Sequence, residues 1–560
     1  MPRDYNHLSR EQLVEILQRR DLEANYGLVW ERDEIEPEAA INHDYVGLRL
    51  DPALSCGPAP WQHLVIEGDN WDALRALAAT HQGQVKLIYI DPPYNTGRRD
   101  FLYNDRWFEK THRYRHSVWL EFMYKRLLLA RELLAPDGAI FVSIDDNELF
   151  NLGLLMNKVF GEENFIANCI WQKAFAPKNS AQHFSDDHEY VLVYAANREL
   201  WRPNLLPRTE KQDRAFKNPD NDPRGPWTSG DLAARNFYSE GRYPITCPSG
   251  RIIEGPPAGS YWRVSKARFE ELDRDGRIWW GKDGNNTPRI KRFLSEVKQG
   301  VVPQTLWTYE EVGHTQDAKK QLNEMLPMGR NADVFSTPKP LQLMERILRI
   351  GSQPGDLVLD FFAGSGTFGQ AVLQLNAASP DAPPRRFILV SNREATAEEP
   401  EKNLCRDICA ERLRRAIAKL GAHPTAGFAY AVAERIPRHR MVEKLPDALV
   451  WSFAQLAHDH PLTLFTRPLA QSRRGAHLLL YAPRASASAV RAVEAALANH
   501  AGPATLYTWS PDDYAHLAGR IVVRVPEALL AAFRQGTAGA ARAVAQNNEV
   551  PVVGPAPASL

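Results

Sequence analysis

Two nearly unbroken apolar runs, each ending in a motif that cannot continue a strand, constrain the fold more than any other feature. Residues 85–90, VKLIYI, stop at two consecutive prolines, and residues 356–360, DLVLD, lead into a turn that contains Gly364 and Gly366. Runs of this length are typical of parallel strands buried on both faces, and proline cannot donate to the ladder of a central strand. The two runs therefore predict strands of an α/β protein that end in functional loops.

Strand and helix patterns alternate around both runs. They predict a strand, turn and helix over residues 63–77, a helix over 118–134, a strand over 139–145, a strand over 385–394 and a helix over 405–420. Alternation of this kind is typical of βαβ units in a largely parallel sheet. A capped amphipathic helix is predicted near the N-terminus, over residues 9–24.

The composition is that of a globular protein with several domains. The chain has 560 residues, of which 44% are hydrophobic and 24% charged, and its formal net charge is zero. Its apolar stretches are strand-length, well short of the ~20 residues of a membrane helix, and the N-terminus lacks the apolar core of an export signal. The five cysteines are scattered without the spacing of a zinc site. We therefore expect a cytoplasmic protein with no metal and no membrane association.

The first motif with chemical content is Asp91-Pro92-Pro93-Tyr94, directly after the first apolar run. A rigid turn at a strand end would by itself explain the prolines. An exocyclic amino nitrogen is a poor nucleophile because its lone pair is delocalised into the ring. The Asp91 carboxylate and the Pro92 carbonyl could accept its N–H bonds, aim the lone pair at an electrophile and stabilise the developing charge. The prolines stiffen this loop, and Tyr94 offers a ring on which a flipped base can stack.

The second motif follows the second apolar run and consists of Asp360, Phe361, Phe362, Ala363, Gly364, Ser365, Gly366 and Thr367. Glycines at this place let a ligand approach the backbone closely, and the N-terminus of the next helix suits an anionic group such as a carboxylate. Glu394 ends the following predicted strand, where it could accept the ribose hydroxyls of an adenosine cofactor. A solvated charge at a strand end is the alternative for Glu394, and a glycine turn alone is common in nucleotide-binding proteins.

Together the two motifs resemble those of the DNA amino-methyltransferases, whose Pro-Pro loop holds the target base and whose Gly-rich loop binds S-adenosyl-L-methionine (AdoMet). Here the catalytic motif precedes the cofactor motif by 269 residues (360 minus 91), which is the inverted order of the β class. Segments such as GDNWDALRAL, LLAPDGAIFVSIDDNE, EVGHTQDAKKQL and TPKPLQLMERIL resemble the modification subunits of type III restriction systems. By this resemblance Lys339 belongs to the AdoMet site. The run 391–394, SNRE, departs from the family's glutamine-containing pattern, which bears on the ribose contact.

The resemblance implies a Rossmann-like, AdoMet-dependent methyltransferase core with circularly permuted motif order. The expected parts, in chain order, are an N-terminal helical segment (1–55), the catalytic half of the core (56–165), an inserted target-recognition region (166–325), the AdoMet-binding half (326–423), a C-terminal accessory α/β domain (424–545) and a disordered tail (546–560). In the recognition region, residues 261–300 hold ten Lys/Arg against six Asp/Glu, interleaved with three tryptophans. Such a mixture suits contacts to phosphates and bases, although a solvated surface over core tryptophans is the alternative.

The implied activity is transfer of a methyl group from AdoMet to the N6 nitrogen of an adenine flipped out of double-stranded DNA. Asp91 favours adenine, because serine at this motif position is commoner in the cytosine-N4 enzymes of the family. Cytosine-N4 methylation, an RNA substrate, and a specificity subunit that mainly recruits a nuclease-helicase partner are the alternatives. The resemblance also implies a homodimer and a separate restriction subunit with helicase and nuclease activity.

Overall fold

The computed structural model describes most of residues 44–532. The gaps in this range are 98–101, 104–105, 108–113, 209, 298–299, 327–334, 336, 397–398, 422–425, 438–444, 518–519 and 526, and residues 9, 10, 14, 28 and 30 are also described. The helix predicted over residues 9–24 therefore lies largely outside the described residues, and the predicted tail lies wholly outside them. The chain forms two compact units, Met1–Pro203 with Gln304–Leu560 and, separately, Asn204–Pro303.

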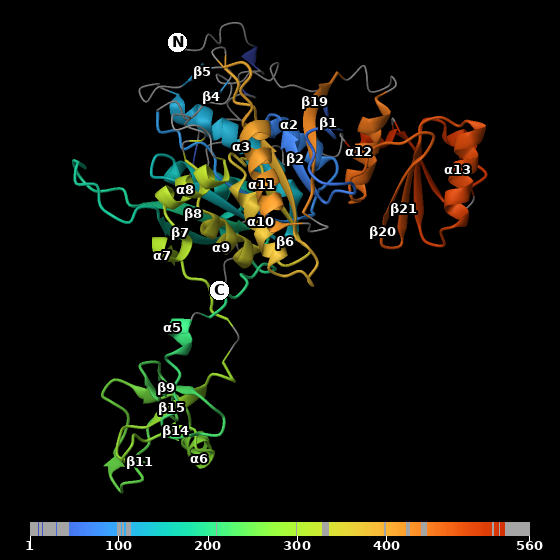
Figure 1. The fold of residues 1–560 in the computed structure, drawn as a ribbon. Helices are drawn as coiled ribbons and strands as arrows, with labels where there is room; N and C mark the ends of the chain where they lie inside the picture. The colour runs from blue at the N-terminus through green and yellow to red at the C-terminus, as the bar shows by residue number, and fades with distance from the viewer. Residues whose placement is uncertain are drawn as a thin grey trace. The chain divides into compact units, whose positions relative to one another are not determined.

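The described part of the larger unit is built on a ten-stranded sheet (Figure 1). In spatial order the strands are β1 (Tyr45–Leu50), β19 (Phe428–Ile436), β2 (His63–Glu67), β18 (Arg386–Ser391), β17 (Leu357–Asp360), β3 (Val85–Ile90), β6 (Leu134–Ile144), β8 (His188–Ala195), β7 (Phe165–Gln172) and β16 (Leu306–Trp307). The six strands from β19 to β6 are mutually parallel, whereas β1 and β8 run antiparallel to their neighbours. Both apolar runs of the sequence are thus central parallel strands, as predicted.

Helices pack on both faces of this sheet (Figure 1). One layer consists of α2 (Asn70–Ala78), α3 (Arg115–Leu133) and α4 (Leu149–Phe160), and the other of α9 (Leu341–Gly351), α10 (Thr367–Ala377) and α11 (Glu411–Leu420). Side chains of a strand point alternately to its two faces, and because helices cover both faces of β3, all of its residues except Lys86 are apolar. Its Ile88 and Ile90 share a hydrophobic cluster with α2–α4, whereas Tyr89 points the other way and stacks on Phe368 of α10. The result is a doubly wound, Rossmann-like α/β core.

Shorter elements complete this unit. They are β4 (Leu102–Tyr103), β5 (Arg106–Trp107), the 3-10 turn η2 (Glu162–Asn164), α7 (Tyr309–Val312), α8 (Thr315–Met325) and the π-helical turn η3 (Cys405–Ala410). In the part of the chain that the structure describes, we find no helix that is both long and apolar enough to cross a membrane.

In its described residues, the smaller unit, 204–303, consists of short strands and two helices. Its elements are α5 (Glu210–Asp213), β9 (Trp227–Asp231), β10 (Ala233–Ala234), β11 (Ile245–Thr246), β12 (Ile252–Ile253), β13 (Tyr261–Trp262), α6 (Lys266–Arg274), β14 (Ile278–Trp279) and β15 (Arg289–Phe293). The largest sheet has the order β14-β15-β9, and a cluster around Trp262, Phe269 and Trp280 forms the core.

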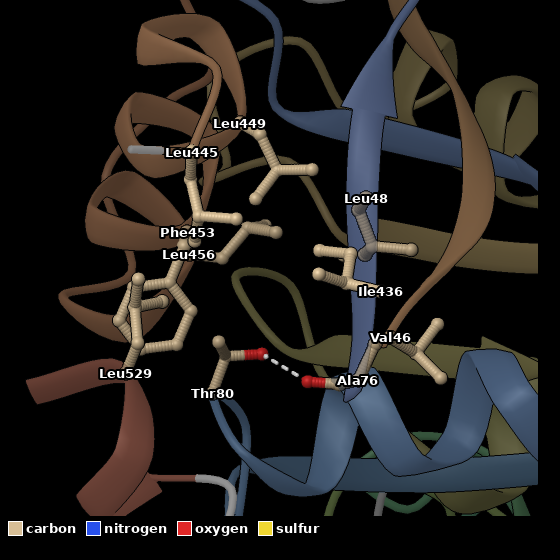
Figure 2. Close-up of a pocket in the computed structure, with 11 residues that line it drawn as sticks. Val46, Leu48, Ala76, Thr80, Ile436, Leu445, Leu449, Phe453, Leu456 and Leu529 are labelled. Atoms are coloured by element: carbon tan, nitrogen blue, oxygen red, sulfur yellow. Dashed lines mark hydrogen bonds between the residues drawn. The ribbon is translucent and has the colours of Figure 1, made fainter. Parts of the chain in front are cut away.

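The C-terminal part of the larger unit has a second, four-stranded sheet. Its elements are α12 (Asp447–Ala457), β20 (Ala470–Arg474), β21 (His477–Ala482), α13 (Ala487–Ala498), β22 (Ala504–Thr508), the 3-10 turn η5 (Pro511–Tyr514) and β23 (Ile521–Arg524). Helix α12 packs against both β1 and β21. Figure 2 shows the apolar pocket at this junction, where Leu449 and Phe453 of α12 face Leu48 of β1. The small sheet is therefore attached to the core through an apolar contact.

The observed boundaries differ from the expected ones at three places. Strands β7 and β8 and the segment that begins at Gln304 belong to the core unit, so the separate unit is shorter than the expected 166–325. Strand β1 occupies part of the segment expected to be helical, and β19 joins the core sheet although it lies beyond residue 424. Alternation of apolar and polar residues indicates that a segment is a strand, but it does not specify the sheet in which that strand pairs.

Candidate active site

The two sequence motifs lie side by side because their strands are neighbours. Strands β3 and β17 pair in parallel, with Leu87 opposite Val358 and Ile88 opposite Leu359. Their carboxyl ends therefore meet at one edge of the sheet, where Asp91 follows β3 and Asp360 ends β17. The chain turns to opposite sides from these two strands, and such a switch point is where open α/β sheets bind ligands.

The loop that begins at Asp91 is held in place by polar contacts to the helical layer. The indole Nε1 of Trp119, in α3, donates to the Pro93 carbonyl at 2.7 Å. Asn95 is fully buried in the left-handed region at φ 56°, and its amide donates to the Glu148 carboxylate at 2.5 Å. Tyr94 donates from its hydroxyl to an Asp91 oxygen at 2.9 Å. The loop is thus preorganised before any ligand binds.

Lys339 completes a cluster of charged groups around this loop. Its Nζ donates to both carboxylate oxygens of Asp91, each at 2.8 Å, and lies 2.9 Å from the Tyr94 hydroxyl. Glu189, at the start of β8, accepts from Tyr94 at 3.0 Å and lies 3.5 Å from Lys339. Lys173 lies 3.3 Å from the other oxygen of Glu189. Two carboxylates and two lysine ammonium groups therefore form a chain of alternating charge beside Tyr94.

The protonation of this cluster follows from its burial and charges. Burial raises the pKa of Asp91, and the neighbouring Lys339 offsets part of that rise. Burial would also raise the pKa of Glu189, but Lys339 and Lys173 together hold it below its usual value. Burial, reinforced by Asp91 and Glu189, raises the pKa of Tyr94 well above its usual value, so its hydroxyl remains a donor. For Lys339, the two acids outweigh burial and raise the pKa of the ammonium group.

The second loop requires its glycines. Gly364 and Gly366 have φ of 49° and 76°, the left-handed region that other residues rarely adopt. A Cβ on Gly364 would lie 2.9 Å from the ring of Phe335, and one on Gly366 would lie 3.0 Å from the Cys409 sulfur. The π-helical turn η3 brings Cys409 to this position, and such turns are frequent at functional sites. Gly366 is also the N-cap residue of α10, so the loop presents free backbone N–H groups to a ligand.

The hydroxyl groups of this loop are directed toward a buried arginine. Arg412, in α11, is fully buried, and its guanidinium donates to Ser365 at 3.1 Å, Thr367 at 2.6 Å and Gln370 at 2.7 Å. Burial lowers its pKa to about 10, so it stays charged at neutral pH. Arg412 thus holds the loop from the buried side. Because the side-chain hydroxyls point toward Arg412, the loop can contact a ligand through its backbone.

The other predicted cofactor residues are placed in different surroundings. Asp360 is buried and accepts the N–H of Phe362 at 2.9 Å, and burial raises its pKa well above the usual value. Glu394 is exposed at φ 51°, with its carboxylate 3.5 Å from Lys402. Lys339, which the family resemblance placed in the AdoMet site, contacts the Asp91 loop. Glu189 and Arg412 were not identified from the sequence. The local signal for Glu189 is an acidic residue directly before the largely apolar segment 190–195.

The tryptophans in residues 261–300 belong mainly to the core of the smaller unit. Trp262 and Trp280 are buried, and Trp279 packs on Trp227 with ring centroids 5.2 Å apart. Several basic side chains of this stretch are paired with acids; for example, Arg277 donates to Glu296. An exposed aromatic group on this unit joins Tyr261 of this stretch to two residues outside it, Phe237 and Arg242. Phe237 is 78% exposed and contacts Tyr261, whose ring lies 4.8 Å from the Arg242 guanidinium.

This arrangement joins a rigid Asp-Pro-Pro-Tyr loop and a glycine loop at one sheet edge, as in the amino-methyltransferases. A family model described as DNA methylase, of the N6/N4 type, matches residues 85–389, which is more than half of the chain. The chain belongs to this family of N6/N4 DNA methylases.

The curated relatives of this chain include the Mod subunits of type III restriction-modification enzymes. The chain is 34% identical to the type III restriction-modification enzyme StyLTI Mod subunit of Salmonella typhimurium, over 65% of this chain and 58% of that protein. It is 33% identical to the EcoPI Mod subunit of Escherichia phage P1, over 60% of this chain and 58% of that one, and 30% identical to the EcoP15I Mod subunit of Escherichia coli, over 64% and 63%. The chain thus spans about three fifths of the length of these relatives.

The glycine loop fits the cofactor of this family, AdoMet. The fit rests on Gly364 and Gly366, whose left-handed φ values and close packing on Phe335 and Cys409 allow only glycine, so the loop offers its backbone rather than side chains to a ligand. The loop from Asp360 to Thr367 would hold the cofactor with its backbone, and the N-terminus of α10 would favour the cofactor's carboxylate.

Proposed function

We propose that this protein is a DNA methyltransferase that transfers a methyl group from AdoMet to the N6 nitrogen of adenine. The observation that carries the proposal is the adjacency of the Asp91 loop and the glycine loop on two neighbouring parallel strands. A base held by one loop would lie beside a cofactor held by the other. When bound, AdoMet supplies an electrophilic methyl group.

The residues of the Asp91 loop are suited to activating an amino nitrogen. In the structure Asp91 already accepts two N–H bonds from a single nitrogen, that of Lys339, at 2.8 Å. The proposal assigns the same kind of contact to the adenine amino group, with the Pro92 carbonyl as a second acceptor. Lys339 must then release an Asp91 oxygen when the base binds. The methylated nitrogen loses its proton to solvent, so the mechanism requires no strong general base.

The choice of adenine depends on Asp91. Within the family, serine at this position is commoner in cytosine-N4 enzymes, whereas the acid is typical of adenine enzymes. The negative charge of Asp91 also stabilises positive charge on the amino nitrogen more strongly than a hydroxyl would.

The likeness to Mod subunits supports a role in a type III restriction-modification system. On this proposal the unit 204–303 reads the DNA sequence, partly through the exposed group of Phe237, Arg242 and Tyr261, since arginine and aromatic side chains suit phosphates and bases. A homodimer and a helicase-nuclease subunit are the proposed partners, in the cytoplasm. Cleavage of DNA would then be the task of that second subunit.

Sequencing of modified bases in DNA from cells that express this chain tests the proposal. We expect N6-methyladenine in one sequence context, and none in cells that express Asp91→Asn at the same level. N4-methylcytosine instead would overturn the choice of adenine. Unmodified DNA, with AdoMet bound by the purified protein, would overturn the activity. The surrounding sequence of the modified base identifies the recognised site for the experiments below.

A further inference from the structure

The hairpin between β7 and β8, residues 173–187, leaves the sheet at the catalytic edge. Strands β6 and β7 both pair antiparallel with β8, so they run in the same direction. Since β3 and β17 are parallel to β6, β7 ends at the edge where Asp91 and Asp360 lie. Figure 1 shows the hairpin as a long teal loop that projects beyond the sheet near β7 and β8. It has no assigned role in the chemistry described above.

The base of the hairpin is joined to the catalytic cluster. Lys173, its first residue, forms an ion pair with Glu189, and Glu189 accepts from Tyr94. The Lys173 carbonyl also accepts the N–H of Thr315 at 3.1 Å. Next to it, Phe175 packs against His314, with ring centroids 5.4 Å apart. A displacement of the hairpin would therefore be transmitted to the groups around Asp91.

The hairpin has an ordered backbone but leaves a large apolar side chain in solvent. Its arms are joined by the N–H of Ala174, which donates to the Asp187 carbonyl at 3.2 Å, and by that of Lys178, which donates to the Ser185 hydroxyl at 2.8 Å. Phe184 is nevertheless 92% exposed, the highest value for a large hydrophobic side chain in the described part of the chain. Hydrogen bonds between its arms thus hold the backbone of the hairpin, whereas the Phe184 ring is exposed to solvent.

The length of the hairpin suits entry into a duplex. Phe184 comes three residues before Asp187, which lies at the base of the hairpin. Three residues of extended chain span about 10 Å, at ~3.3 Å per residue. The major groove of B-DNA is about 8.5 Å deep. A ring carried that far from the catalytic edge can reach the base stack while the Asp91 loop receives a base that has left it.

We propose that Phe184 inserts into the DNA duplex at the target site and fills the space that the flipped adenine leaves. This inference rests on the proposed function. Removing a base from the stack costs unstacking energy, and an apolar ring placed between base pairs offsets part of that cost. The rest of the tip is exposed and, except for Ala181, polar, which suits the groove and the phosphates: Lys178, Asn179, Ser180, Gln182 and His183. A protein partner would instead require an apolar surface around Phe184.

The test compares Phe184→Ala with Leu200→Ala on two substrates. Leu200 is 57% exposed and follows β8 at the opposite edge of the sheet, so it is a matched control for loss of an exposed apolar side chain. One substrate is a duplex with the recognised site; the other has the same target adenine opposite an abasic position, where the base is already unpaired. We expect Phe184→Ala to slow methyl transfer to the intact duplex roughly tenfold or more, since stacking on one aromatic contributes that much. The loss should largely disappear on the abasic substrate, and Phe184→Trp should retain activity on both.

A second readout follows base flipping directly. With 2-aminopurine in place of the target adenine, wild-type protein should raise its fluorescence, and Phe184→Ala should raise it less at equal DNA occupancy. Equal methylation of the intact duplex by Phe184→Ala and wild type would overturn the inference, as would an equal loss on both substrates. Wild-type protein that methylates neither substrate would instead count against the proposed function itself, so the two failures are distinguishable.

Discussion

Replacing Lys339 with methionine removes the ammonium group that lies 2.8 Å from both oxygens of Asp91 while keeping most of the side-chain stem. Lys339 is 8% exposed, so water cannot replace its charge. Among the described residues, Lys173 is then the cation that still pairs with this carboxylate pair, through Glu189. Because burial already raises the pKa of Asp91, loss of its main counter-charge drives the carboxylate pair to take up one proton near neutral pH.

The magnitude follows from that proton. In the unfolded chain an aspartate has a pKa of about 3.9, so keeping it protonated at pH 7 costs about 4 kcal/mol, at about 1.4 kcal/mol per pH unit. This is an upper bound, and it agrees with the roughly 3–5 kcal/mol expected for a broken buried ion pair. The sign is fixed: the folded variant binds a proton that the unfolded chain has released. The stability of Lys339→Met relative to wild type must therefore fall as pH rises from about 4 to 7.

Urea unfolding followed by tryptophan fluorescence at pH 5, 6 and 7 measures this difference. Lys339→Met should be less stable than wild type by up to about 1.5 kcal/mol at pH 5 and by up to about 4 kcal/mol at pH 7. The double variant Asp91→Asn, Lys339→Met is the matched control, since its amide does not titrate and its deficit should not grow with pH. A deficit of Lys339→Met that is absent at pH 7, or independent of pH, would refute the reasoning. Methyl transfer by the single variant should also be lost near neutral pH, because a protonated, neutral Asp91 no longer stabilises positive charge on the amino nitrogen.

Three further changes have defined outcomes. Gly366→Val should weaken AdoMet binding at least tenfold by calorimetry, because a left-handed residue with a side chain costs about 1–2 kcal/mol and its Cβ would meet Cys409; unaltered affinity would contradict the assigned loop. Arg412→Met should lower the melting temperature and weaken AdoMet binding, because it removes three buried hydrogen bonds, each typically about 1 kcal/mol; a variant with wild-type affinity would show that the loop holds its shape without Arg412. Arg242→Ala should weaken DNA binding and reduce the slope of log affinity against log salt by about one, and an unchanged slope in a filter-binding series would remove Arg242 from the DNA surface.

The local sequence was sufficient to predict the two central strands and the loops that end them. A short apolar run is accommodated best as a parallel strand buried on both faces. Prolines or glycines at its end restrict the backbone directly. The strands at 85–90 and 357–360, and the helix predicted over 118–134, are found within a few residues of the predicted bounds. The motif order and the family resemblance also indicated the class of protein, which the match to the DNA methylase family confirms. The roles of the individual site residues stay predictions.

The tertiary structure alone decided which distant residues join these loops. Asp91, Glu189 and Lys339 come from separate parts of the chain and meet through the order of strands in the sheet. No periodicity in the sequence encodes that proximity, because ion pairing depends on which strands become neighbours. The same holds for Arg412, whose position beneath Ser365 and Thr367 follows from the packing of α11 on α10. Local propensity thus determined the Asp91 loop, whereas its charged surroundings were decided by long-range packing of strands and helices, since only folding brings those charges within a few ångströms.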